Sequence, residues 1–442
     1  MCARERNYPS TAEEIANRRD RAVLVGVDRA SAQWPIEESM AELERLAHTA
    51  GAEVVDTLTQ RLDKPNPRTF IGAGKAEEVA HIARDSGANV VIIDDDLTPT
   101  QQANLEDIIP DTKVLDRTQL ILDIFALHAA SREGKLQVEL AQLEYMLPRL
   151  RGMWGHLVRE RLGGGRGARF GAGESQLETD RRLARKRIRD LKRDLASVAR
   201  ERELQRKQRA RSGLFRVSLV GYTNAGKSTL LNALTAAQVL SADMLFATLD
   251  STTRRLALPE GRGVTLTDTV GFIHKLPHGL VEAFKSTLDE VSASDLLLHV
   301  TDASASHRDA QMQAVREVLH EIDAHRTRQL VVFNKLDLIG QEERALLARR
   351  HPAAVLVSAQ TGEGIDSLLR RVAEEAARDS VTLTVLVPYT RGEIVKLAHE
   401  RAQVLSETHT PHGTRMMLRA PTEIADTFDD FALSEEGSAV DE

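Results

Sequence analysis

The sequence predicts an α/β fold built on mostly parallel sheets. Short apolar runs alternate with helical patterns in residues 21–130 and again in 215–378, as is typical of parallel strands joined by helices. Residues 135–211 between them carry heptad spacing instead. We therefore expect an α/β domain at 1–134, a helical hairpin at 135–212, a second α/β domain at 213–378 and a small α/β domain at 379–442.

The first domain is expected to contain four strands and four helices in alternation. The strands are Ala22–Val27, Glu53–Leu58, Asn89–Ile93 and Lys113–Leu115, and the helices are Ile36–Thr49, Ala76–Asp85, Thr98–Ile109 and Thr118–Ala129. Phe70–Lys75 is rich in glycine but shorter than a phosphate-binding loop, which favours a plain turn from strand to helix. Asp94–Asp96 ends a strand, where a solvated strand end is favoured and a metal site is the alternative.

Two apolar seams predict an antiparallel helical hairpin. Their residues follow the spacing 4, 3, 4, 3 and are Leu136, Leu140, Leu143, Leu147 and Leu150, then Ala184, Ile188, Leu191, Leu195 and Val198. Pro148 should kink the first helix near its end, because proline lacks the N–H that the helix needs. The connecting loop, residues 151–175, contains 8 glycines and also Arg159, Arg161, Arg166 and Arg169.

The charge of the chain is distributed unevenly. The 442 residues contain 59 Lys and Arg against 66 Asp and Glu, for a net charge of -7. Residues 149–211 hold 20 basic and 8 acidic groups, a net of +12, so the remainder carries -19. Arginine pairs with phosphate and glycine permits close approach, so this basic segment suggests a probe for folded RNA, with a solvated helix and loop as the alternative. Such binding should weaken with salt.

Composition excludes several classes of protein. A single cysteine, Cys2, excludes a disulfide framework and a cysteine-ligated zinc site. No apolar run approaches 18 residues, and Met1–Ser10 is polar, so we expect neither a membrane span nor a signal peptide. We expect a cytoplasmic monomer that does not bind DNA.

A phosphate-binding loop is the clearest motif. Residues 221–228 fit G-x-x-x-x-G-K-[ST] between the expected strand Arg216–Val220 and the helical Thr229–Leu234. Lys227 would bridge the β- and γ-phosphates, and Ser228 would bind Mg²⁺. The expected nucleotide-binding residues are Gly221, Tyr222, Thr223, Asn224, Ala225, Gly226, Lys227, Ser228 and Thr229.

Two further motifs would read a guanine base. Asn334-Lys-Leu-Asp337 follows the strand Gln329–Phe333, and Asp337 can accept hydrogen bonds from guanine N1–H and the 2-amino group, which adenine does not offer. Ser358-Ala-Gln360 follows the strand Ala354–Val357 and can supply an N–H to guanine O6. The residues assigned to the base are Asn334, Lys335, Leu336, Asp337, Ser358, Ala359 and Gln360. Together these motifs predict a P-loop GTPase domain with a mixed, mostly parallel sheet.

The segment between these motifs should sense the γ-phosphate. Asp268-Thr-Val-Gly271 follows the apolar-alternating Gly263–Thr267; Asp268 can hold Mg²⁺ through water and the Gly271 N–H can contact the γ-phosphate. A threonine that binds Mg²⁺ is expected upstream, and Thr248, Thr252 and Thr253 are the candidates that spacing leaves open.

Hydrolysis should be unusual in one respect. GTPases of the Ras type place a water-orienting Gln after the D-x-x-G motif, whereas this chain has Phe272. Intrinsic hydrolysis should therefore be slow or should use a group or ion from elsewhere. Asn224 is either a K⁺-binding residue or a residue that only stabilises its loop.

The last segment is expected to be a small α/β unit. Its elements are a strand at Thr382–Val387, a helix near Arg391–Glu400 and a strand at Met416–Leu418. From Pro421 onward there are 8 acidic residues and no basic one, so the tail after Ala420 is expected to be disordered.

The sequence resembles the HflX family of ribosome-associated GTPases over most of its length. Outside the GTPase domain the resemblance rests on Lys135–Leu143, Leu147–Leu150 and the Gly163–Gly173 loop running into Glu174–Arg182. Inside that domain it rests on Gly221–Thr229, Phe246–Asp250, Asp268–Ile273, Leu276–His278 and Ala283-Phe284.

The resemblance implies a site and a function. It favours Thr248 as the Mg²⁺ ligand with Ser228, with Thr253 second, and Lys227, Thr248 and Gly271 as the catalytic residues. It extends the nucleotide-binding set to Phe246, Ala247, Thr248, Leu249, Asp250, Asp268, Thr269, Val270 and Gly271. Two departures are Ser251, where the family commonly has Pro, and the hairpin tip Arg166–Gly173.

Family members bind the large (50S) ribosomal subunit in the GTP state. Their hairpin loop reaches toward the peptidyl-transferase centre in ribosomal RNA, and they split or rescue stalled or idle ribosomes, an activity associated with stress. GTP or GDP, Mg²⁺ and K⁺ are the expected cofactors. Some members also hydrolyse ATP, although this chain has no second phosphate loop. The alternatives are an RNA-remodelling protein whose nucleotide site only gates assembly, and a GTPase that regulates a protein or membrane partner through a dimeric hairpin.

Overall fold

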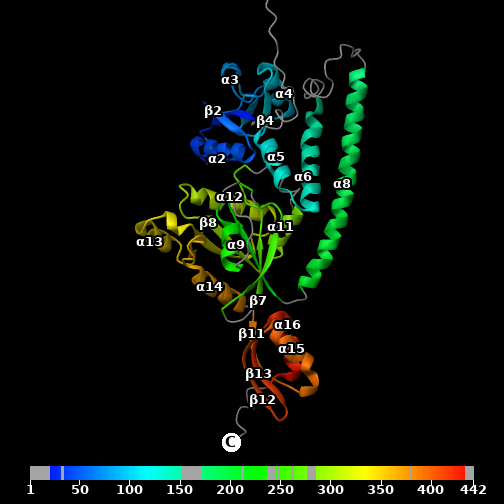
Figure 1. Cartoon of the computed structure of the whole chain (residues 1–442), viewed down its shortest axis with the longest axis vertical. Helices are drawn as coiled ribbons and strands as arrows, with labels where there is room; N and C mark the ends of the chain where they lie inside the picture. The colour runs from blue at the N-terminus through cyan, green and yellow to red at the C-terminus, as the bar shows by residue number, and fades with distance from the viewer. Residues whose placement is uncertain are drawn as a thin grey trace, which may run out of the picture. The chain divides into compact units, whose positions relative to one another are not determined.

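A computed structural model describes residues 20–30, 34–151, 172–210, 214–235, 245–246, 248–259, 263–275, 285–378 and 380–433 (Figure 1). Contacts divide the chain into two compact units, Met1–Arg193 and Asp194–Glu442. Across these ranges, no helix combines the length and the apolar character needed to cross a membrane.

The first unit contains a four-stranded parallel sheet with the strand order β2-β1-β3-β4. Its strands are β1 (Arg21–Asp28), β2 (Glu53–Arg61), β3 (Val90–Ile93) and β4 (Lys113–Asp116). They alternate with α2 (Ile36–Thr49), α3 (Ala73–Ser86), α4 (Pro99–Ile108) and α5 (Arg117–His128), as the sequence predicts.

Burial explains why β1 and β3 read as continuous apolar runs. All four residues of β3 are buried, because helices cover the parallel sheet. Val79 of α3 and Leu105 of α4 pack with Val91 in one core cluster. Local signals set the helix ends: Thr98 and Gln101 form a capping box before α4, and Gly87 ends α3 in the left-handed conformation. Phe70–Gly72 forms the turn before α3, and Ala73–Lys75 already belong to the first turn of the helix.

The expectation of a solvated strand end is wrong for Asp94. Its side chain is 2% exposed, accepts a hydrogen bond from Ser39 at 2.5 Å and forms an ion pair with Arg117 at 2.6 Å. Arg117 also pairs with Glu42 of α2. The guanidinium, itself 1% exposed, supplies the charge that lets the carboxylate be buried beneath α2 and α5. No group of acidic, His or Cys side chains that could hold a metal ion occurs among the described residues.

A helical hairpin follows, formed by α6 (Arg132–Met146), the 3₁₀ turn η1 (Leu147–Arg151) and α8 (Ala172–Ala210). Ion pairs between Glu139 and Arg187 (2.7 Å) and between Glu144 and Lys192 (2.8 Å) join the helices, which lie side by side in Figure 1. The predicted kink at Pro148 is wrong, because the α-helix ends at Met146 and the proline lies in η1.

Burial along the predicted seams is uneven. Leu140, Ile188 and Leu191 are buried, whereas the other seam residues are half-buried. The glycine-rich tip at 152–171 lies outside the described residues.

The second unit contains a six-stranded sheet with the order β10-β9-β8-β5-β7-β6, in which only β6 is antiparallel. The strands are β5 (Phe215–Gly221), β6 (Thr252–Ala257), β7 (Gly263–Asp268), β8 (Leu296–Asp302), β9 (Arg328–Asn334) and β10 (Val355–Leu356). The helices are α9 (Lys227–Thr235), α11 (Lys285–Ser292), α12 (Arg308–Glu321), η2 (Leu336–Leu338), α13 (Gln341–Arg350) and α14 (Ile365–Ala377).

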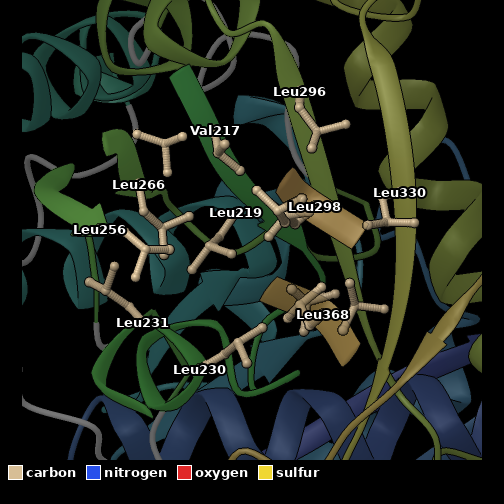
Figure 2. Packing of buried hydrophobic residues seen from close by; sticks show 14 of the residues in the cluster. Val217, Leu219, Leu230, Leu231, Leu256, Leu266, Leu296, Leu298, Leu330 and Leu368 are labelled. Carbon is tan, nitrogen blue, oxygen red and sulfur yellow. The ribbon is translucent and has the colours of Figure 1, made fainter. Parts of the chain in front are cut away.

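A leucine-rich core covers one face of this sheet. Figure 2 shows Leu219, Leu266 and Leu298 from neighbouring strands packed against Leu230 of α9 and Leu368 of α14. Helices α11 and α12 contact the sheet as well. Because the parallel strands end at one edge, the loops after β5, β7, β9 and β10 meet there.

The C-terminal segment forms an antiparallel sheet with the order β11-β13-β12. Its elements are β11 (Ser380–Val387), η3 (Tyr389–Arg391), α15 (Gly392–Arg401), β12 (Gln403–Thr410), β13 (Gly413–Pro421), α16 (Thr422–Ala425) and η4 (Asp426–Phe431). The expected disorder after Ala420 is wrong through Leu433. Despite the acidic composition, Ile424 and fully buried Phe428 anchor this stretch in the core. Residues 434–442 lie outside the described part.

Candidate guanine-nucleotide site

The phosphate-binding loop connects β5 to α9, and two glycines permit its shape. A Cβ on Gly221 (φ +156°) would lie 2.1 Å from the carbonyl oxygen of Val300. A Cβ on Gly226 (φ +87°) would lie 2.3 Å from Nδ2 of Asn334. Any side chain at either position would collide with the neighbouring strand or its loop, so the spacing of the motif follows from close packing.

Lys227 lies beneath this loop rather than in solvent. Its side chain is 6% exposed, and Nζ donates to the carbonyl oxygens of Gly221 (3.2 Å) and Tyr222 (2.9 Å). Burial lowers the pKa of Lys227 to about 8, against an opposing effect of Asp268. A phosphate on the loop would replace these carbonyls as the partner of the ammonium and would favour its charged form.

Three side-chain oxygens from three elements converge next to the loop. Ser228 Oγ lies 2.8 Å from Thr248 Oγ1 and donates to Asp268 Oδ2 at 2.7 Å, while Thr248 Oγ1 donates to the same oxygen at 3.1 Å. Asp268 Oδ1 is buried and has no hydrogen-bond partner among the described residues. Burial raises the pKa of Asp268, so its ionised form calls for a nearby cation. This all-oxygen set with an orphaned carboxylate oxygen fits Mg²⁺.

The three threonines that are candidates for the Mg²⁺ ligand lie in different places. Thr252 and Thr253 lie in β6, paired with β7, and Thr253 Oγ1 is 3.0 Å from Thr267 Oγ1. Only Thr248 reaches Ser228 and Asp268. Phe246 and Leu249 are buried, Asp250 is half-buried, and Ala247 lies outside the described residues.

The base-reading motifs meet through Asn334. Its Nδ2 donates to the carbonyl of Ala225 at 3.0 Å, and its Oδ1 accepts from the N–H of Ala359 at 3.0 Å. Asn334 thus ties the phosphate loop to the Ser358–Gln360 loop. Ser358 Oγ donates to Asp337 Oδ1 at 2.5 Å and holds that exposed carboxylate.

Other residues of the base motifs have structural partners or remain exposed. Lys335 has a left-handed backbone (φ +64°), and its Nζ lies 2.8 Å from Asp302 Oδ2. Leu336 is buried beneath the motif, and Gln360 is exposed.

A contact that sequence reasoning missed joins the phosphate loop to the segment after Asp268–Gly271. The N–H of Thr223 donates to the carbonyl of Phe272 at 2.7 Å, and the N–H of Phe272 donates to the carbonyl of Gly221 at 3.1 Å. The N–H of His274 donates to the Tyr222 hydroxyl at 2.7 Å. Thr269 and Val270 are buried, and the Thr269 hydroxyl donates to Leu219. Only the proximity of β5 and β7 creates this pairing, so no local pattern could reveal it.

Three features lie at one edge of a mostly parallel sheet. They are the loop between β5 and α9, the side-chain oxygens of Ser228, Thr248 and Asp268, and the Asn334 side chain that joins two loops. This fold and this order of motifs define a GTPase of the P-loop class. Family models match residues 37–126 (GTP-binding GTPase N-terminal), 128–209 (GTP-binding GTPase middle region) and 216–335 (50S ribosome-binding GTPase). The chain belongs to the HflX family of GTPases.

Curated relatives extend over nearly the whole chain. GTPase HflX of Caldanaerobacter subterraneus subsp. tengcongensis is 45% identical over 422 residues, 96% of either chain. GTPase HflX of Escherichia coli (strain K12) is 46% identical over 387 residues, 87% of this chain and 90% of that one. A crystal structure of a GTP-binding protein from Sulfolobus solfataricus in complex with GDP is 25% identical and covers 81% of this chain and 99% of that chain, with a TM-score of 0.43.

Proposed function

We propose that this GTPase binds the large ribosomal subunit in its GTP form and splits or rescues stalled or idle ribosomes. In this proposal the hairpin tip contacts ribosomal RNA near the peptidyl-transferase centre. The observation that carries it is the combination, in one chain, of a nucleotide site with a basic helix α8. The match of residues 216–335 to a 50S ribosome-binding GTPase model supports the choice of partner.

The basic face of α8 supports an RNA partner. Ile188 and Leu191 are buried, and Arg187 and Lys192 are paired with acidic residues of α6. The exposed basic residues in the same part of the helix are Arg182, Arg185, Lys186, Arg189 and Arg193. Closely spaced cations on one exposed surface attract phosphates, and their binding weakens with salt as counterions are released.

We infer the following roles in the hydrolysis of GTP to GDP and phosphate. Lys227 holds the β- and γ-phosphates, Ser228 and Thr248 hold Mg²⁺, and the Gly271 N–H contacts the γ-phosphate. Mg²⁺ would neutralise charge on the phosphate oxygens. Asp337 and the Ser358–Gln360 loop recognise guanine, and in this proposal Asn224 helps to bind a K⁺ ion.

Further parts of the proposal concern the cellular setting. We infer a cytoplasmic monomer that acts under stress and does not bind DNA. ATP hydrolysis through the N-terminal domain remains a prediction from the family resemblance.

Co-sedimentation with isolated large subunits tests the proposal. Binding should be strong with a non-hydrolysable GTP analogue, weak with GDP, and reduced as salt is raised from 50 to 200 mM by a factor of roughly 10³ or more if six phosphates are contacted. The variant R185E/R189E should bind more weakly, whereas the control R349E/R350E, which reverses two exposed arginines of α13, should bind normally. Nucleotide-independent binding by wild type would contradict the proposal.

Splitting is measured separately by sedimentation of 70S particles incubated with the protein and GTP. Release of subunits that requires GTP supports a splitting factor. If K227A binds ribosomal RNA and acts as well as wild type, the nucleotide site only gates assembly and the RNA-remodelling alternative replaces the proposal.

A further inference from the structure

Phe272 leaves the attacking water without the side chain that usually orients it. The residue follows Asp268–Gly271, where Ras-type GTPases use Gln. Its side chain is 1% exposed, and its backbone N–H and carbonyl are both bonded to the phosphate loop, to Gly221 and Thr223. An aromatic ring buried in this way does not hold a water molecule by a hydrogen bond, so orientation of the water falls to another group.

Thr223, the third residue of the phosphate loop, carries an unused hydroxyl. The residue is 6% exposed, and Oγ1 is buried without a hydrogen-bond partner among the described residues. The neighbouring hydroxyls differ: that of Tyr222 accepts from His274, and that of Thr269 donates to Leu219. A buried hydroxyl without a partner is unfavourable, so a bound group that supplied one would be favoured.

The position of Thr223 places it at the γ-phosphate end of the site. A Cβ on Gly271 would lie 2.8 Å from Thr223 Cγ2, 2.9 Å from Thr223 Cα and 3.1 Å from Lys227 Nζ. The methyl group of Thr223, Gly271 and the Lys227 ammonium therefore lie close together, and rotation about the Thr223 Cα–Cβ bond would bring the hydroxyl to the position of the methyl group. In P-loop GTPases the loop lysine and the segment after the Mg²⁺-linked Asp surround the γ-phosphate and the attacking water.

We propose that Thr223 is a catalytic residue for GTP hydrolysis, whose hydroxyl orients the attacking water. Oγ1 accepts a hydrogen bond from the water and donates its own hydrogen to a γ-phosphate oxygen. The water oxygen bonds to Pγ, the bond from Pγ to the β–γ bridging oxygen breaks, and GDP leaves with that electron pair. The water proton ends on inorganic phosphate, and the threonine neither gains nor loses a proton. The inference rests on the GTPase part of the proposed function and is independent of ribosome binding.

The test compares T223V, T223S and wild type in single-turnover GTP hydrolysis by the full-length protein without ribosomes. The reaction is followed until wild type has hydrolysed all of its GTP. Valine keeps the shape of threonine but removes the hydroxyl, and serine keeps the hydroxyl. The control T408V makes the same replacement at an exposed threonine of β12. Fluorescent GTP-analogue affinity and far-UV circular dichroism are measured for every variant.

T223V should hydrolyse GTP about tenfold to hundredfold more slowly, with an affinity for the GTP analogue within threefold of wild type, because one transition-state hydrogen bond is lost. T223S should recover most of the rate, and T408V should match wild type. A wild-type rate for T223V would overturn the proposal, as would an equal loss in T223S and T223V. If T223V is misfolded, T223A takes its place as the variant without a hydroxyl. A T223S rate as low as that of T223A would then refute the role of the hydroxyl. A failure of ribosome binding alone would leave these rates unchanged, which separates the two proposals.

Discussion

Replacing Asn334 with alanine should uncouple the phosphate loop from the base-reading loop. The side chain is 2% exposed and makes two 3.0 Å hydrogen bonds, to the carbonyl of Ala225 and from the N–H of Ala359. N334A would leave both backbone groups unpaired, at about 1–3 kcal/mol for each fully buried group. Ala225 is buried, but Ala359 is only half-buried, so we expect a total loss of about 2–4 kcal/mol.

Nucleotide binding has to order the two loops again once they are uncoupled, so up to the whole of this loss should appear as weaker nucleotide binding. At about 1.4 kcal/mol per tenfold change, the Kd of a fluorescent GDP analogue should rise roughly 30-fold to 1,000-fold. N334D is the informative companion, because Asp keeps an acceptor for the Ala359 N–H but has no donor for the Ala225 carbonyl. It should bind no more tightly than N334A.

The matched control is N104A, which removes a single hydrogen bond to the Arg68 carbonyl on the N-terminal domain. Its Kd should equal that of wild type. A Kd for N334A within threefold of wild type, in a folded protein, would refute the idea that this side chain couples the two loops.

Three other changes probe the same domain. Burial lowers the pKa of His299 to about 4, below its ordinary 6.5, and both ring nitrogens lack partners among the described residues. Between these pH values the unfolded chain binds a proton that the folded chain does not. The free energy of unfolding should therefore fall as the pH drops from 6.5 toward 4, by up to about 3 kcal/mol. Hydrogen exchange in β8 at pH 7.5 and 5.5 measures this loss, and H299L should abolish it. D337N should shift preference from GTP toward xanthine nucleotides, measured by competition, because Asn accepts one fewer hydrogen bond from guanine. G221A should abolish nucleotide binding in the same titration, because its Cβ would meet the Val300 carbonyl at 2.1 Å.

Each of these expectations has a result that contradicts it. If the stability of H299L depends on pH as strongly as that of wild type, His299 is not the group that causes the loss of stability. Unchanged GTP affinity in D337N would dismiss Asp337 as the base reader. Normal nucleotide binding by G221A would contradict the steric argument. The control is G74A in α3, where a Cβ meets no atom within 4 Å.

Strand–helix alternation was sufficient to predict the N-terminal sheet, because short apolar runs mark its strands and short loops join them to helices. The same reasoning placed the phosphate loop at the end of β5. It did not mark β6 and β8 as strands, although both take part in the six-stranded sheet. It also predicted disorder after Ala420, because composition shows the acids but not the pocket that receives Phe428.

The chain's own sequence determined the chemistry of the site. The spacing of Gly221, Lys227, Asp268 and Asp337 predicts a guanine-nucleotide site, since each lies in a motif that follows a strand and each can contact a different part of the nucleotide. Only the tertiary structure brought the Thr248 hydroxyl to Ser228 and Asp268, joined Asn334 to two loops and left the Thr223 hydroxyl without a partner among the described residues. These outcomes depend on contacts between segments that are distant in sequence, and such contacts exist only once the strands of one sheet bring their ends together.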